Sequence, residues 1–137
     1  MVDKNKIILL SVSFIFLISC STEPVETCDY ENDNVHYDCI QAIFELSCMT
    51  YGNCHTTGGN IPNLSLGISH GNIVNKTATW SDQNYIEPYF PNLSILYKQL
   101  EQSVSDDRYF MPLNGNKISQ EKIDYIRSWI QSGAQLN

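Results

Sequence analysis

Residues 47–59 read SCMTYGNCHTTGG, and this stretch holds the two cysteines and the histidine that decide the fold. Five residues separate Cys48 from Cys54, and His55 follows Cys54 directly. Two nearby thiols in a small loop are typical of a disulfide. Two thiols beside an imidazole are also typical of a site that binds a cofactor covalently and ligates its metal. Other features of the sequence are needed to choose between a disulfide and a cofactor site.

Residues 1–19 predict a lipoprotein signal peptide. Lys4 and Lys6 give a positive start, residues 7–18 are apolar apart from two serines, and the small residue Ser19 precedes Cys20. The apolar run is shorter than the about 20 residues of a transmembrane helix. Leu-Ile-Ser-Cys, ending at Cys20, resembles a bacterial lipobox. It implies cleavage before Cys20, acylation of that cysteine, and an exported protein anchored to a membrane in the periplasm or at the cell surface.

The charge balance limits the class of partner. Without residues 1–19 the chain has six Lys and Arg against fourteen Asp and Glu, so its formal net charge changes from −7 to −8. An acidic surface disfavours nucleic acid and anionic lipid headgroups. It favours a basic protein partner.

The remaining cysteines allow two pairings. With Cys20 acylated, Cys28, Cys39, Cys48 and Cys54 remain, and thiols in an oxidising compartment are expected to be bonded. Two disulfides satisfy this count, and so does a Cys28–Cys39 disulfide together with two thioethers to a haem. The number of cysteines alone does not choose between these arrangements.

The chain divides into a tether and one domain. Residues 20–36 are polar and acidic, which predicts a flexible tether, and residues 37–137 predict a single domain. Apolar residues recur at helical spacing in three places, and no segment shows sustained strand-like alternation. We therefore expect an all-α fold with long ordered loops. The three expected helices are 38–48, 92–100 and 119–134, the last with Ser119 as its cap, Glu121 in its first turn and Gly133 at its end.

The loops are too long for an ordinary small helical domain. Residues 56–91 and 103–117 are rich in Gly, Asn, Ser, Thr and Pro. Long loops in a compact domain usually serve a function. A haem would account for them, because a large flat apolar group can act as a core around which loops wrap.

A covalent haem site needs two thiols, a histidine on one face of the iron and a ligand on the other. Cys48 and Cys54 supply the thiols, and His55 is placed to ligate the iron. Methionine is a common second ligand in electron-transfer sites. Met111 is the better candidate, because Met49 lies inside the attachment loop while Met111 lies in a separate loop stiffened by Pro112.

From Ile40 to the end the chain resembles the planctomycete-type cytochrome c domain, a small monohaem domain of exported bacterial lipoproteins. The resemblance covers nearly 100 residues and implies a cytochrome c-like helical fold. It implies one covalent haem c on Cys48 and Cys54, iron ligation by His55 and Met111, and electron transfer to a redox partner without catalysis. Its pieces are, in order, IQAIFELSC…CH, LSLGISHGNIVN, EPYFPNLSILYKQL, MPLNGNKIS and IDYIRSWIQSGAQLN.

The sequence departs from that family at the attachment site. The family has two residues between the cysteines, and here Tyr51 stands where the first cysteine belongs. Three arrangements remain open: a bulged loop with both thioethers, a single thioether through Cys54, or a haem-free fold with a Cys48–Cys54 disulfide. The last would make the protein a disulfide-stapled binding or scaffold lipoprotein.

Two further alternatives concern the iron. His70, expected in a surface turn, is a second candidate for the distal ligand. A haem sensor or a peroxidase-like site would instead require an open position, with Met111 not bound. No arrangement of nucleophile and base indicates an enzyme.

Overall fold

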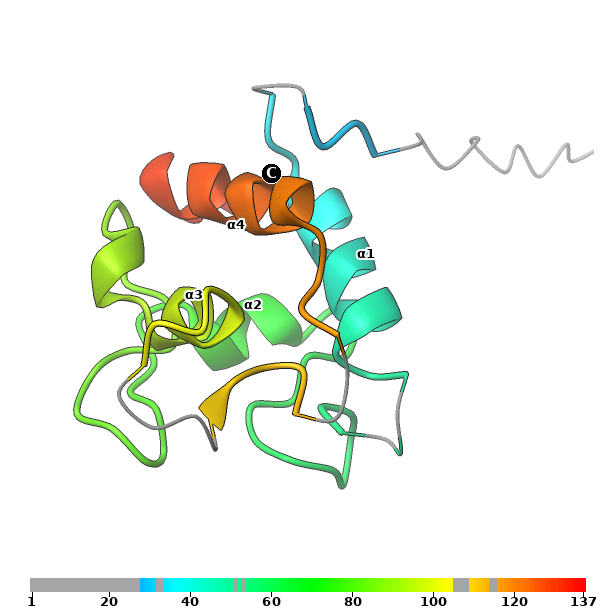
Figure 1. Ribbon diagram of the computed structural model, residues 1–137, viewed down its shortest axis with the longest axis vertical. Helices are drawn as coiled ribbons and strands as arrows, with labels where there is room; N and C mark the ends of the chain where they lie inside the picture. Colours follow the sequence, from blue (N-terminus) through cyan, green and yellow to red (C-terminus); the bar gives the residue numbers. More distant parts are fainter. Residues whose placement is uncertain (1–27, 32–33, 51, 53, 105–108, 114–115) are drawn as a thin grey trace, which may run out of the picture.

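The computed structural model describes residues 28–31, 34–50, 52, 54–104, 109–113 and 116–137. Figure 1 shows α1 and α4 at one end of the molecule and long loops at the other. The elements are α1 (Tyr37–Ser47), α2 (Ser69–Ile73), the 3₁₀ turn η1 (Pro91–Leu93), α3 (Ile95–Leu100) and α4 (Gln120–Gln131).

The expected all-α fold is confirmed for this part of the chain. Within the described ranges β pairing is limited to two isolated bridges, Val74 with Ile86 and Thr77 with Asn84. The helices are short and the loops long, as the composition of residues 56–91 indicated.

Helix α1 forms the first side of the core. Ile40, Ile43 and Phe44 are fully or almost fully buried and pack toward α4. Their spacing of three and four residues places them on one face of the helix. The helix ends at Ser47, where the Cys48 amide donates to the Phe44 carbonyl at 2.8 Å. Helix α1 therefore delivers Cys48 to the loop end of the molecule.

Helix α4 forms the opposite side of the core. Its buried face includes Ile123, Ile126, Trp129 and Ile130, whose spacing of three, three and one positions is that of the expected amphipathic helix 119–134. Glu121 lies in the first turn, where a negative charge interacts favourably with the helix dipole. Ser119 directly precedes the helix, as predicted. Its side chain makes no capping hydrogen bond, so the predicted capping interaction was wrong.

Gly133 ends the α4 region because two conditions require a glycine there. Its φ of +102° is accessible to few other residues. A Cβ atom at this position would lie 2.8 Å from the Tyr89 ring. The loop that leads into η1 is thereby held against the end of α4, and the Tyr89 amide donates to the Ile130 carbonyl at 2.7 Å.

The remaining helices differ from the sequence prediction. The expected helix 92–100 is broken into η1 and α3, because Ser94 between them is extended and its hydroxyl donates to the Phe90 carbonyl at 3.0 Å. Helix α2 was not predicted. It is held by tertiary contacts: the Tyr37 and Ser69 hydroxyls lie 2.6 Å apart, and the Ser69 hydroxyl donates to the side chain of Gln41.

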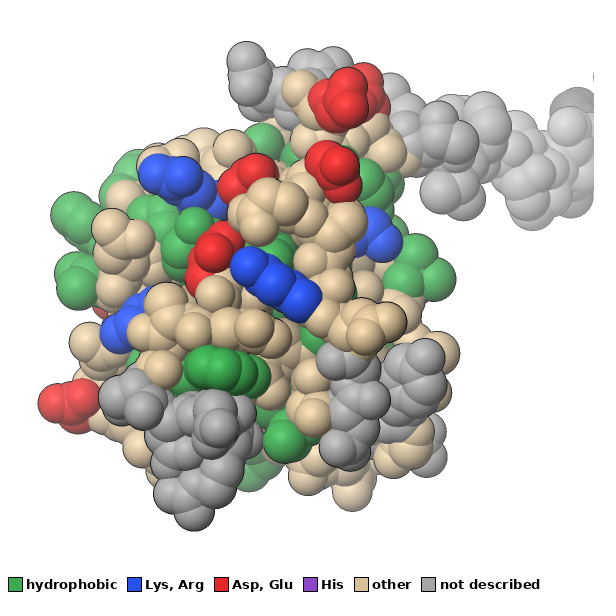
Figure 2. All heavy atoms as spheres, viewed as in Figure 1, with side chains coloured by type: hydrophobic (Ala, Val, Ile, Leu, Met, Phe, Trp, Pro, Cys, Tyr) green, Lys and Arg blue, Asp and Glu red, His purple; other side chains and the backbone are tan. Residues whose placement is uncertain are grey.

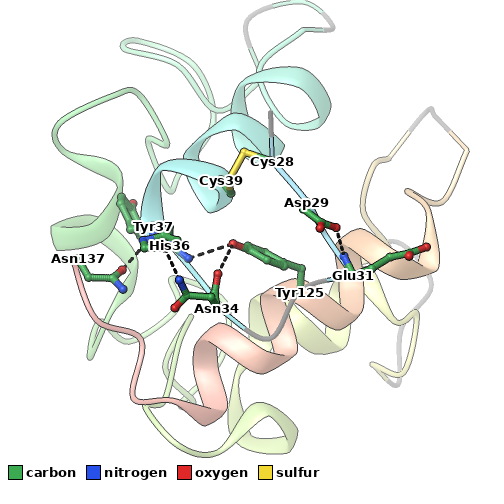
Figure 3. Close-up of a disulfide and its surroundings, with 9 residues drawn as sticks. All are labelled: Cys28, Asp29, Glu31, Asn34, His36, Tyr37, Cys39, Tyr125 and Asn137. Carbon is green, nitrogen blue, oxygen red and sulfur yellow. Dashed lines mark hydrogen bonds between the residues drawn. A yellow bond between two sulfur atoms is a disulfide. The ribbon is translucent and has the colours of Figure 1, made fainter. Parts of the chain in front are cut away.

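The described part of the expected tether is bound to the domain. Cys28 and Cys39 form a disulfide with a Cα–Cα distance of 5.5 Å (Figure 3). The His36 amide donates to the Tyr125 hydroxyl at 3.0 Å (Figure 3). Asn137 donates through its side chain to the Val35 carbonyl. Residues 28–31 and 34–36, which fall within the expected tether over 20–36, are thus held by contacts with both α1 and α4.

The expected signal peptide and Cys20 lie outside the described residues. None of the helices in the described ranges is both long and apolar enough to cross a membrane. Figure 2 shows acidic and basic side chains intermixed on the surface over α4.

Candidate cofactor site

A cavity of about 850 Å³ lies at the loop end of the molecule. Cys48, Cys54, His55 and Met111 all line it. These are the four residues that the sequence analysis selected for a covalent haem. They come from three places: the end of α1, the loop that follows it, and the loop before α4. Pockets for small molecules and cofactors typically have volumes of about 300–1,000 Å³, so this cavity has the size of a ligand site.

Backbone hydrogen bonds fold the loop that carries Cys54 and His55. The Asn60 amide donates to the Cys54 carbonyl, and the Leu64 amide donates to the His55 carbonyl at 2.7 Å. Leu64 is buried, and its own carbonyl accepts a bond from the Gln41 side chain at 3.1 Å. Because Gln41 belongs to α1, the loop is fixed to the helix that delivers Cys48.

The imidazole of His55 is oriented by the Pro62 carbonyl, which lies 2.9 Å from Nδ1. A carbonyl oxygen only accepts hydrogen bonds, so Nδ1 carries the proton. In the neutral ring the lone pair is then on Nε2. Metal-binding histidines commonly have their second nitrogen held in this way, because the bond fixes the tautomer and the ring orientation. Sequence analysis did not identify Pro62.

The two cavity cysteines are thiols, and neither is in a disulfide. Burial, and to a smaller degree the nearby Cys54, raise the pKa of Cys48 from 9.0 to about 12. Cys48 is therefore a neutral thiol at physiological pH, in an apolar environment that disfavours its thiolate. The loop between them contains Gly52 with φ +63°, a conformation that suits glycine. Tyr51 and Asn53 lie outside the described residues.

Met111 reaches the cavity from a segment fixed to α3. Its amide donates to the Gln99 carbonyl at 3.2 Å, and its side chain is partly buried against the core. Met49, by contrast, packs against the core and does not line the cavity.

The cavity walls are largely apolar and aromatic. No Lys, Arg, Asp or Glu is among the described residues that line it. The walls come mainly from three loops and α3, and only nonlocal contacts bring them together, so local sequence patterns did not identify them. The main wall residues are Leu64, Trp80, Tyr85, Leu96, Leu100 and Tyr109.

Other candidates from the sequence lie elsewhere. The expected surface turn at His70 is wrong: this residue belongs to α2, and its Nε2 lies 2.8 Å from the Ala134 carbonyl. His70 does not line the cavity. Trp129 is buried beside Tyr37 in the helical core, and its indole donates to the Gln135 carbonyl at 2.9 Å.

The residues at the cavity fit a haem better than a bare metal ion. In the described ranges no three His, Cys, Asp or Glu side chains gather in a way that could hold an ion. The cavity offers the imidazole of His55 and the thioether of Met111 as metal ligands, beside two cysteine thiols. This set matches a metal group that brings its own nitrogen ligands. The apolar walls suit a large apolar ring.

Comparison with protein-family models, with curated proteins and with solved structures finds no match to this chain.

Proposed function

We propose that the domain is a cytochrome c-like electron-transfer protein that binds one covalent haem in the cavity at its loop end. The observation that carries this proposal is the convergence of Cys48, Cys54, His55 and Met111 on one apolar cavity. Cys48 and Met111, the first and last of these residues, lie 63 positions apart in the sequence. A disulfide module has no need for His55 and Met111 beside its thiols.

The residues have distinct roles in this proposal. Cys48 and Cys54 would form the thioethers, because both line the cavity despite the stretched spacing. This favours the arrangement with two thioethers over a single bond through Cys54. His55 would ligate the iron through Nε2, which its bond to the Pro62 carbonyl leaves as the unprotonated nitrogen. Met111 would be the second ligand.

The bound haem would supply reversible one-electron chemistry at its iron. The chain would hold the iron in one coordination state and exclude water with the apolar walls. A histidine–methionine pair favours the reduced iron and raises the reduction potential. With both positions ligated, an electron carrier is favoured over a sensor or peroxidase-like site. We propose no catalytic activity.

The lipobox-like sequence at Cys20 and the net charge favour a membrane-anchored carrier with a basic partner. An acylated Cys20 would tie the domain to a bacterial membrane, facing the periplasm or the cell exterior. The net charge of −8 without residues 1–19 favours a redox partner with a basic docking surface, because opposite charges speed diffusional encounter.

Haem retention on the unfolded chain tests the proposal. The full-length protein is produced in a host that matures c-type cytochromes, unfolded in denaturant and separated by size. We expect haem absorbance to remain with the polypeptide. Replacing both cysteines, C48S with C54S, should abolish it. The matched control H70A should retain it, since His70 does not line the cavity.

A colourless wild-type protein from that host would contradict the proposal. A Cys48–Cys54 disulfide in the same material would favour the haem-free scaffold instead. If haem is retained, loss of the sulfur–iron charge-transfer band in M111A would identify Met111 as the second ligand.

A further inference from the structure

Two aromatic rings stack face to face at the wall of the cavity. The ring centroids of Trp80 and Tyr109 lie 4.0 Å apart, with an angle of 4° between the ring planes. Both residues line the same cavity as Met111. Trp80 lies between α2 and η1, whereas Tyr109 precedes Met111 by two positions. The stack therefore joins the Met111 segment to a distant part of the chain.

The Trp80 side of the stack belongs to a well-fixed turn. The Ala78 amide donates to the Gln83 carbonyl at 2.9 Å and closes the turn around Trp80. The Lys98 ammonium, on α3, donates to the Gln83 side chain at 2.8 Å. Since α3 packs into the core, the indole presents its face from a rigid base.

The Met111 side is held at two points. The Met111 amide donates to the Gln99 carbonyl at 3.2 Å, and the Tyr109 ring lies on Trp80. Gln99 is buried on α3, the same helix that fixes the Trp80 turn. One contact positions the backbone of Met111, and the other places Tyr109, two positions before it, against Trp80 at the cavity wall.

We propose that Trp80 is a positioning residue that keeps Met111 at the iron by stacking on Tyr109. This inference rests on the proposed haem function. With haem bound, a bond from Met111 to the iron would be in equilibrium with an open state in which Met111 has moved away. Because the stack exists only when the loop is in place, its loss raises the open fraction.

The affinity of the ferric protein for imidazole measures that open fraction, because an added ligand binds only the open state. An aromatic pair changes an equilibrium by about two- to tenfold beyond its buried area. We therefore expect imidazole to bind about two- to tenfold more tightly to W80L and to Y109L than to the wild type. W80F should stay close to the wild type, since a phenyl ring can still stack on Tyr109.

The double variant separates the stack from general loosening. If Trp80 and Tyr109 act through each other, W80L with Y109L should bind imidazole no more tightly than either single variant. Unchanged imidazole affinity in W80L, or effects of W80L and Y109L that simply add, would overturn the inference. So would a W80F protein that behaves like W80L.

Hydrogen exchange at the Met111 amide gives a readout that does not need the haem. We expect faster exchange in W80L and Y109L, and near wild-type exchange in W80F. Equal exchange in all four proteins would overturn the positioning role by itself. Absence of haem from every variant, with exchange altered as expected, would overturn the proposed function while upholding the stack as the anchor of the loop.

Discussion

The helical end and the loop end of this molecule are built differently. At the helical end, α1 and α4 bury a continuous set of apolar side chains, among them Ile40, Ile126 and Trp129. At the loop end, hydrogen bonds hold the chain around a cavity of about 850 Å³. Close packing of side chains stabilises the first region by itself, whereas the second lacks a filling of its own. This difference is consistent with the proposal that the loops enclose a bound group.

The largest effect should come from the helical end. Trp129→Ala removes a side chain that is 1 % exposed and breaks the indole bond to the Gln135 carbonyl. We expect a loss of about 3–5 kcal/mol in the free energy of unfolding, measured by urea denaturation. Trp129→Phe, which keeps a large ring, should cost less. An equally small loss in both variants would mean that this end is not the main core.

The next effect concerns the attachment of the N-terminal segment. Replacing both Cys28 and Cys39 by Ser opens a loop that spans 11 positions. On the chain-entropy account this costs about 3 kcal/mol of unfolding free energy. Unfolding with and without a reductant, in the wild type and the double variant, measures it. An unchanged stability would show that the contacts of residues 28–31 and 34–36 suffice without the covalent link.

Two matched truncations compare the ends directly. Ile126→Ala should cost about 2–5 kcal/mol whether or not haem is attached, because its surroundings are closely packed. Leu96→Ala should cost only about 2 kcal/mol in protein made without haem, at the low end of that range, since Leu96 borders an existing cavity and its removal opens little new empty space. With haem attached, the cost of Leu96→Ala should rise. Equal costs of Leu96→Ala in both preparations would remove the distinction between the two ends.

The smallest effect is a dependence on pH at the junction of α1 and α2. Burial raises the pKa of Tyr37 above its ordinary 10.0, although its bond to Ser69 opposes the shift. The Tyr37 hydroxyl therefore ionises at lower pH in the unfolded chain than in the folded one. Its contribution to the free energy of unfolding is fully present below pH 10 and is lost as pH rises through the pKa of the folded state.

Unfolding measured on both sides of pH 10 tests this sign, with Tyr37→Phe as the control. The free energy of unfolding of Tyr37→Phe should decline less at alkaline pH than that of the wild type. The rest should remain, because burial also raises the pKa of Tyr30 and Tyr97. A variant with the full wild-type decline would exclude Tyr37 as a contributor.

Sequence patterns predicted the parts of the fold that depend on local periodicity. The apolar faces of α1 and α4 follow from residues three and four positions apart, and Gly133 marks the end of α4. Helix α2 was missed because Ser-His-Gly-Asn-Ile has little helix propensity of its own. It forms because Ser69 and His70 have partners in α1 and the C-terminal segment.

The candidate site shows the same division. Cys48, Cys54, His55 and Met111 were selected from residue type and order, and all four line the cavity. Their support could not be predicted, because Pro62, Trp80 and Tyr109 act through contacts between loops. Such contacts leave no periodic signal in the sequence.

Peptide mapping of protein made in a host that matures c-type cytochromes tests the central claim most directly. We expect the fragment containing Cys48 and Cys54 to carry one haem, bound through both sulfur atoms. A fragment from the same preparation in which Cys48 and Cys54 are joined to each other and carry no haem would contradict it.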